Sequence, residues 1–201
     1  MDTKVSFSVW DWRDILRASL PILESKCIRN NPDAQYISFS FQDGIATVYC
    51  TNNIILFRAD INVQTEKDFS LKSLLLPPIK APAHTKAVEL YIDPEALDTT
   101  VSFVDEDNDI VGSSVVKHID ICPPDFDRIY KSCQGKIDKY NYGAGLYHIA
   151  VNPAQLIAAL QGVKDDEKVI LNFAEIHNAF MIRPVDRDGY KTLILPVRWS
   201  E

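Results

Sequence analysis

The chain has 201 residues, 46% of them apolar, which is enough to fill the core of one large domain or two small ones. Its formal net charge of −7 argues against a surface that is basic all over, as in a protein that coats DNA non-specifically, although a local stripe of cations could still contact DNA. No apolar run approaches the ~20 residues that span a bilayer, and residues 1–4 lack the charged start and apolar block of a signal peptide. The four cysteines form no CxxC pair. We therefore expect a soluble cytoplasmic protein with reduced thiols and no membrane contact, and a disulfide is the alternative.

The first part of the chain predicts a βαβββ unit. Alternating apolar and polar residues predict a strand at 5–9. A helix should begin near Trp10, because Ser8 and Asp11 have the spacing at which a hydroxyl and a carboxylate satisfy free backbone N–H groups. Pro21 should end or kink this helix, since its ring removes a donor and clashes with the preceding turn. Three strand-like runs follow, at 35–41, 46–51 and 54–63.

The middle of the chain, 68–120, predicts a weaker copy of the same unit. A short strand around Phe69 is expected to lead into a helix over 71–76, which Pro77 and Pro78 cut short. Three further strands are predicted at 87–92, 99–104 and 110–119.

The last part of the chain predicts the unit again, after a segment of different composition. Residues 122–145 are rich in Pro, Asp, Lys, Tyr and Gly without sustained periodicity, which is typical of a linker or crossing segment. A strand is then expected at 147–151. The next helix should begin with Asn152 as its cap and Pro153 at its first position, and Gly162 is placed to stop it. Three strands follow, at 168–174, 179–184 and 191–198.

These elements predict an α+β fold of βαβββ repeats with antiparallel sheets and few helices. We expect a domain of two repeats at 1–121, a connector at 122–145 and a half-domain of one repeat at 146–201. Each copy needs a neighbour to bury its apolar helix face. Symmetric scaffolds of this kind usually work by shape and surface, which favours binding over catalysis.

No constellation of residues indicates catalysis, a metal or a cofactor. The acidic run 105–109 resembles the start of a calcium loop, but Ile110 and Val116 stand where that loop needs glycine and a bidentate glutamate, so a polar hairpin turn is favoured. A Gly-rich phosphate loop and a nucleophile elbow are both missing from the sequence. Cys50, within a strand run, is interpreted as a small buried residue. The histidines pair with no Cys or carboxylate at a ligand spacing: His84, His118, His148 and His177.

One helix offers a candidate basic face. Arg13 and Arg17 lie four residues apart, so both project from one side of the first helix, and an ordinary solvated helix face is the alternative interpretation. The later helix weakens a DNA-binding interpretation, because 154–162 contains no cation and three acidic residues follow Lys164. The patch on the first helix could be extended by Lys4, Lys26 and Arg29.

Five short segments, in order along the chain, resemble the bacterial sliding clamp, the beta subunit of DNA polymerase III. The first two are 5–9 (VSFSV) and 39–44 (FSFQDG). The third, 48–56 (VYCTNNIIL), stands where the family tends to have V-x-T-D-G-x-R-L. The fourth, 123–129 (PPDFDRI), is similar to the family's F-P-D-Y-R-R-V connector, and the fifth, 193–198 (LILPVR), to its closing V-V-M-P-M-R. The resemblance implies a clamp-like fold over most of the chain.

The chain also departs from that family. A clamp subunit has three domains of two repeats each and dimerises into a ring around duplex DNA, whereas this sequence supplies about three repeats. Asn53 stands where the family prefers glycine, and Ile55 where it prefers arginine. A ring would therefore require a homo-oligomer of higher order, since head-to-tail contacts close only when the rotation allows it.

The resemblance implies a shallow apolar groove that captures short peptide motifs from a DNA polymerase or other clamp-binding proteins. The alternative for its last segment is a plain strand built by Leu193, Leu195 and Val197, in which every second residue faces the core. Carried over position by position, the groove would involve Thr51, Asn53, Leu56, Pro124, Arg128, Ile129, Leu193, Leu195, Pro196 and Val197.

The expected function is that of a sliding-clamp-like processivity factor or partner-recruiting protein of DNA replication or repair, and not of an enzyme. In this role Arg13 and Arg17 would contact duplex DNA independently of sequence. The alternative is a clamp-like adaptor or decoy that keeps the groove without encircling DNA. An enzyme on a related scaffold is a third hypothesis, for which the sequence offers no reactive constellation.

Overall fold

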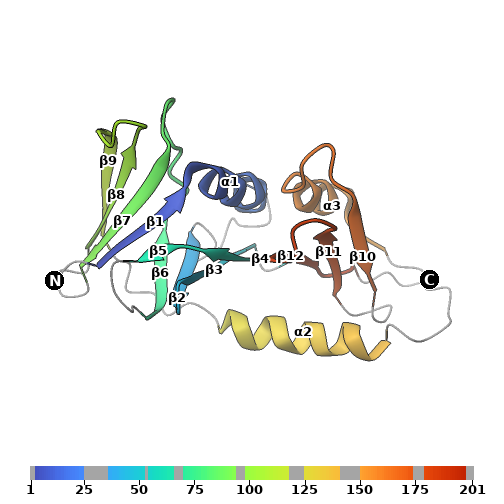
Figure 1. Ribbon diagram of the computed structural model, residues 1–201. Coiled ribbons are helices and arrows are strands. Elements are labelled where there is room, and N and C mark those ends of the chain that lie inside the picture. The colour runs from blue at the N-terminus through green and yellow to red at the C-terminus, as the bar shows by residue number, and fades with distance from the viewer. Residues whose placement is uncertain are drawn as a thin grey trace.

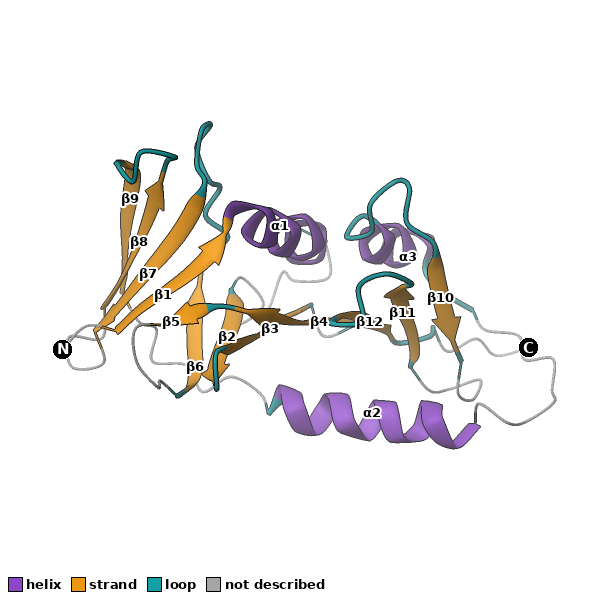
Figure 2. Ribbon diagram, in the orientation of Figure 1, coloured by secondary structure: helices purple, strands orange, loops and turns teal. Residues whose placement is uncertain are grey.

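The computed structural model describes residues 3–24, 36–52, 54–65, 70–93, 98–117, 125–140, 150–173 and 179–197. Within these ranges the chain forms two antiparallel sheets and three helices (Figure 1, Figure 2). The predicted α+β class with antiparallel sheets and few helices is confirmed.

The first sheet has five strands in the order β5-β1-β7-β8-β9. Apolar residues alternate along its central strand, where Val88, Leu90 and Ile92 are fully buried and the residues between them are partly exposed. The strands are β1 (Thr3–Ser8), β5 (Gln64–Thr65), β7 (Ala87–Asp93), β8 (Asp98–Val104) and β9 (Ile110–Lys117).

The second sheet has seven strands in the order β10-β11-β12-β4-β3-β2-β6. Its three C-terminal strands do not form a sheet of their own, because β12 pairs with β4 and so extends the sheet of the first repeat. The strands are β2 (Ile37–Gln42), β3 (Ile45–Thr51), β4 (Ile55–Asn62), β6 (Leu71–Leu76), β10 (Val169–Asn172), β11 (Phe180–Pro184) and β12 (Tyr190–Ile194).

The first helix, α1 (Val9–Leu23), begins as the sequence predicts. The backbone N–H of Asp11 donates to Ser8 Oγ at 3.1 Å, and the same hydroxyl donates to the Asp11 carboxylate at 2.6 Å. Pro21 lies in the last turn, and the helix ends two residues after it, at Leu23. Because the proline stands so close to the end of the helix, its missing N–H removes only one of the last backbone hydrogen bonds.

The predicted helix over 71–76 is wrong. This segment is strand β6, which pairs with β2 so that Leu76 lies opposite Ile37 and Leu74 opposite Phe39. Leu74 and Leu76 face the main core. Four leucines within six residues do not distinguish a helix from a buried strand. Here the segment pairs with the open edge of β2 and is therefore a strand. Phe69 lies outside the described residues.

The predicted connector at 122–145 is not irregular throughout, because it contains helix α2 (Phe126–Tyr140). The carboxylate of Asp125 accepts from the backbone N–H of Arg128 at 3.0 Å, as an N-cap does. The apolar residues of the first two turns fall at helical spacing: Phe126, Ile129, Tyr130 and Cys133.

The C-terminal part keeps most of its predicted elements. Helix α3 (Pro153–Leu160) is capped by Asn152, whose side chain accepts from the backbone N–H of Ala154 at 2.9 Å. Gly162 follows the helix at a point where an added Cβ would lie 2.9 Å from Ala18 Cβ, so α1 and α3 approach closely only with glycine here. In the predicted strand at 147–151, positions 147–149 lie outside the described residues, and 150–151 are not in a strand.

The helices lie on opposite faces of the seven-stranded sheet. Helices α1 and α3 are on one face, and α2 runs along the other (Figure 1). The main core lies on the α1 and α3 side, where Phe7, Trp12, Phe39 and Phe41 pack edge-on or stacked. A smaller core lies on the α2 side.

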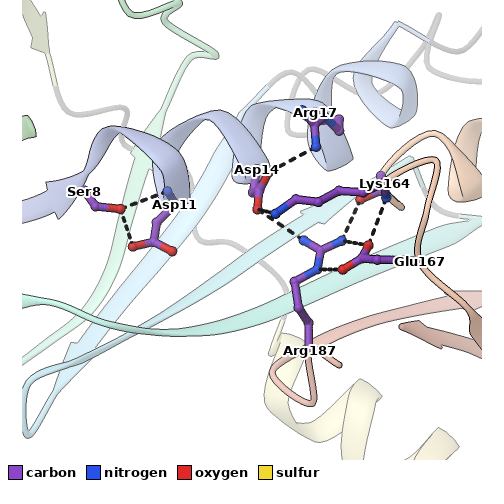
Figure 3. A network of polar contacts seen from close by, with 8 residues as sticks. Ser8, Asp11, Asp14, Arg17, Lys164, Glu167 and Arg187 are labelled. Atoms are coloured by element: carbon purple, nitrogen blue, oxygen red, sulfur yellow. Dashed lines mark hydrogen bonds and ion pairs between the residues drawn. The ribbon is translucent and has the colours of Figure 1, made fainter. Parts of the chain in front are cut away.

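An ion network fastens α1 to the C-terminal part (Figure 3). Arg187 donates from Nε and Nη2 to the Glu167 carboxylate, both at 2.5 Å, and its Nη1 lies 3.4 Å from Asp14 Oδ2. Lys164 Nζ approaches the same Asp14 oxygen at 3.0 Å, while Arg17 binds its other oxygen at 3.2 Å. The carboxylate of Asp14 is thus shared by cations from α1 and from the C-terminal part.

None of the described helices is long and apolar enough to cross a membrane. Cys50 and Cys133 are not joined in a disulfide. Cys27 and Cys122 lie outside the described residues.

Candidate functional site

The sheet face that meets α2 gathers side chains from both ends of the chain. Because side chains alternate between faces, Tyr49 and Thr51 of β3 share this face with Leu56 and Arg58 of β4 and with Leu193 of β12. Thr51 and Leu193 lie directly opposite Leu56 on its two neighbouring strands. Segments remote in the sequence therefore form one continuous row.

A pocket of about 170 Å³ lies between this row and α2. One wall is the sheet and the other is the first two turns of the helix. Thr51 contributes a hydroxyl and Cys133 a thiol, and the other lining side chains are hydrocarbon. The lining residues are Thr51, Ile54, Ile55, Leu56, Phe126, Ile129, Cys133, Ala179, Leu193 and Leu195.

The pocket has a buried floor and an exposed mouth. Leu56 and Leu193 are 7% and 3% exposed and form part of the small core. Leu195 and Ile129 are each 45% exposed. The hydroxyl of Thr51 donates to the Ile55 carbonyl at 2.8 Å, so its proton is used within the protein. An apolar side chain entering the mouth would exchange water for contact with Leu195 and Ile129.

Half of the residues predicted for the groove line this pocket: Thr51, Leu56, Ile129, Leu193 and Leu195. Three others do not. Arg128 is exposed beside Ile129, and Pro196 and Val197 follow Leu195 away from the pocket. Asn53 and Pro124 lie outside the described residues.

The strand interpretation of the last segment holds only in part. Leu193 is a buried residue of β12. Strand β12 ends at Ile194, and Leu195 lies just past that end, held by a bond from its N–H to the Ile54 carbonyl at 3.0 Å. Leu195 is therefore not a core residue of the strand, and its half-exposed side chain lies at the mouth of the pocket.

Sequence reasoning missed the α2 wall of the pocket. Phe126 lies about one turn before Ile129 and Cys133 about one turn after it, on the same face of the helix. The sequence does carry a signal for this wall, because apolar residues stand three, four and seven residues after Phe126, which directly follows the Asp125 cap. Ala179 and Ile54 carry no comparable signal, since only the strand pairing brings them together.

Comparison with solved structures shows a clear likeness across nearly the whole chain. The DNA polymerase III beta subunit of Thermotoga maritima matches with a TM-score of 0.68 at 14% identity, covering 98% of this chain and 66% of that one. A putative beta subunit from Eubacterium rectale matches with a TM-score of 0.71 at 15% identity and the same coverage. The DNA polymerase sliding clamp of Bacillus subtilis matches with a TM-score of 0.68 at 13% identity, covering 98% and 64%. The chain has the sliding-clamp fold.

The chain spans 64–66% of the length of these three structures. No protein-family model matches the chain, and no curated protein matches its sequence. The likeness to sliding clamps therefore comes from the three-dimensional arrangement of the strands and helices.

In this clamp-like chain, α2 is held to the sheet by a polar and aromatic cluster beside the pocket. The Tyr49 ring stacks on Phe126 with centroids 5.2 Å apart, and its hydroxyl donates to the Asp127 carboxylate. Burial, followed by this hydrogen bond to Asp127, raises the pKa of the Tyr49 hydroxyl well above its usual range, so it remains a donor. Arg58 lies between Tyr49 and Tyr130, with its guanidinium carbon 5.6 and 4.8 Å from the ring centroids.

The predicted DNA-binding arginines lie on α1, on the opposite side of the sheet from the pocket. Arg13 is half-buried over the ring of Trp10, with its guanidinium carbon 5.5 Å from the ring centroid. Arg17 is exposed and paired with Asp14. The neighbouring helix α3 exposes Ile157, at 58%. Helix α3 contains no cation, and the charge of Arg17 on α1 is partly neutralised by Asp14.

The remaining candidate sites show no reactive arrangement within the described residues. Nowhere in them do three or more His, Cys, Asp or Glu side chains gather as metal ligands. The acidic run 105–109 forms the β8–β9 turn, in which Asp105 Oδ1 accepts from the N–H groups of Asp107 and Asp109. Burial raises the pKa of the Cys50 thiol to about 12, which keeps it protonated at neutral pH.

Proposed function

We propose that the chain is a clamp-like protein of DNA replication or repair that recruits partners by binding short peptide motifs in the pocket between α2 and the seven-stranded sheet. Its role would be binding without catalysis. The partners would be a DNA polymerase or another clamp-binding protein, and the shared clamp fold supports this class of partner.

The apolar pocket carries the proposal. Its volume of about 170 Å³ is below the roughly 300–1,000 Å³ of sites that enclose a whole small molecule. A pocket of this size suits one aliphatic or aromatic anchor side chain of a longer ligand. The half-exposed Leu195 and Ile129 leave its mouth open to a peptide that continues along the surface.

The test is fluorescence polarisation with a labelled peptide that contains Gln and a Leu/Phe pair. We expect saturable binding in the micromolar range. The control peptide replaces the Leu/Phe pair by alanine and should lose most of its affinity, because the anchor supplies the buried apolar area. If wild type at high micromolar concentration binds neither peptide saturably, this function is wrong.

A processivity role on duplex DNA is the second candidate. Arg13 and Arg17 on α1 favour it, because cations on one helix can contact phosphates without reading sequence. The pairing of Arg17 with Asp14 favours the alternative, an adaptor or decoy that does not encircle DNA. A ring would require a homo-oligomer, so mass by light scattering separates the candidates: an oligomer with salt-sensitive DNA binding supports the ring, and a monomer supports the adaptor.

A further inference from the structure

The wall of the pocket formed by α2 depends on residues that do not line the pocket. Phe126, Ile129 and Cys133 complete the pocket from the helix side. We propose that Tyr49, Arg58 and Asp127 are positioning residues, which hold α2 against the sheet so that this wall exists. The proposal rests on the proposed peptide-binding function and names the residues that control it.

Arg58 is the centre of the arrangement. It projects from β4, which is paired on both sides with β3 and β12, so its backbone is fixed. Its Nη1 lies 3.6 Å from Asp127 Oδ1 on α2, and its guanidinium lies over the Tyr130 ring. On its other side it bonds Asp60 at 3.1 Å, which fixes the plane of the guanidinium. One strand residue therefore contacts two successive turns of the helix.

Tyr49 holds the start of the same helix. Its ring stacks on Phe126, a wall residue, and its hydroxyl donates to Asp127, the next residue along the chain. Two neighbouring helix residues are thus held by one side chain of β3. Tyr49 and Arg58 lie directly opposite each other on paired strands, so their contacts to α2 act together.

The remaining described contact between α2 and the sheet is small. It consists of Tyr130, 5% exposed, in a small core with Leu56, Met181 and Leu193, and of Phe126 and Cys133, which are partly buried against this core. Because this apolar area is limited, loss of the polar cluster should let the helix move away from the sheet. Phe126, Ile129 and Cys133 would leave with it, and the sheet alone would present an open apolar strip in place of a pocket.

The experiment combines peptide affinity with the accessibility of Cys133. Affinity is measured by fluorescence polarisation, and alkylation of individual cysteines by iodoacetamide is followed by peptide mass spectrometry. We expect Arg58→Ala to raise the peptide Kd by about tenfold and to speed alkylation of Cys133 several-fold. Arg58→Lys keeps the charge but loses the planar stack, so it should restore only part of the affinity.

Two controls separate local movement of α2 from general instability. Cys50 is 1% exposed in the main core, so it should stay unmodified unless the whole protein unfolds. Arg183→Ala removes another ion-paired arginine of the same sheet, bonded to Asp188 and outside the pocket, and should change neither readout. Tyr49→Phe is the mildest change, because it keeps the ring and removes only the bond to Asp127. It should give a smaller loss in the same direction.

Each outcome has one meaning. If wild type binds peptide and folded Arg58→Ala and Tyr49→Phe leave both the Kd and the Cys133 rate unchanged, the positioning role is wrong. If wild type does not bind peptide, the proposed function is wrong, while the Cys133 rate still tests whether these residues hold α2. If Arg58→Ala also makes Cys50 reactive, that variant is unfolded. The peptide Kd and the Cys133 alkylation rate of Tyr49→Phe then test the positioning role.

Discussion

Leu56 of β4 and Leu193 of β12 lie directly opposite each other, at the line where the first repeat and the C-terminal part share one sheet. Both are buried on the α2 side and form the floor of the pocket. The pocket is therefore assembled from two distant parts of the chain, and it depends on their pairing. Changes at its floor and at its mouth should have different effects.

Leu193→Ala should destabilise the protein. The side chain is 3% exposed, so its truncation leaves a cavity and should lower the free energy of unfolding by about 2–5 kcal/mol. Urea unfolding followed by circular dichroism measures this change. Leu195→Ala, at a 45% exposed position, is the matched control and should cost far less. Equal losses for the two variants would contradict the assignment of floor and mouth.

Leu195→Asp should abolish peptide binding while leaving the fold intact. A carboxylate at the mouth would lose its hydration when the anchor side chain enters, so we expect a loss of about 2 kcal/mol or more in binding free energy, roughly thirtyfold in Kd. Fluorescence polarisation measures the Kd, and circular dichroism checks the fold. Val115→Asp, an equally drastic change at an exposed residue of β9, is the control. Unaltered binding by Leu195→Asp would remove Leu195 from the site.

Glu167→Gln should lower stability in a pH-dependent manner. Burial alone would raise the pKa of Glu167, but the bonds from Arg187 and from the Lys164 N–H outweigh it and lower the pKa below the usual 4.5. A lowered pKa in the folded state means that this stabilisation is complete above pH 4.5 and is lost as the pH falls through the folded value.

The difference in unfolding free energy between wild type and Glu167→Gln should thus be about 1–3 kcal/mol at pH 7 and should shrink below pH 4.5. Urea titrations from pH 7 to pH 3.5 measure it. A difference that stays constant over this range would show that the charge of Glu167 does not stabilise the contact between α1 and the C-terminal part.

Reversing both arginines of α1, in Arg13→Glu with Arg17→Glu, tests the DNA candidate. If they contact phosphates, duplex DNA affinity should fall for every sequence, and the slope of log K against log salt should drop by up to about two. Filter binding at several salt concentrations measures both. Arg183→Glu, on another element, should leave them unchanged. DNA retention equal to wild type in the double variant would exclude these arginines as the contact.

The sequence by itself determined the local elements that carry their own chemical signals. Ser8 and Asn152 cap α1 and α3 as predicted, because a side-chain oxygen two or three residues before a free N–H can satisfy it without help from the rest of the fold. Alternation of apolar residues likewise predicted most strands. The clamp fold could be expected from short motifs in the right order, and half of the predicted groove residues line the pocket.

The features that depend on contacts between segments distant in the sequence could be seen only in the tertiary structure. Residues 71–76 form strand β6 because β2 offers an unpaired edge, and four leucines within six residues are compatible with either a helix or a strand. The pairing of β4 with β12 brought Leu56 and Leu193 together, and the docking of α2 added Phe126 to the wall of the pocket. Backbone pairing between strands and burial between layers are non-local, so the residues of one segment cannot specify them. The pocket exists only once both have formed.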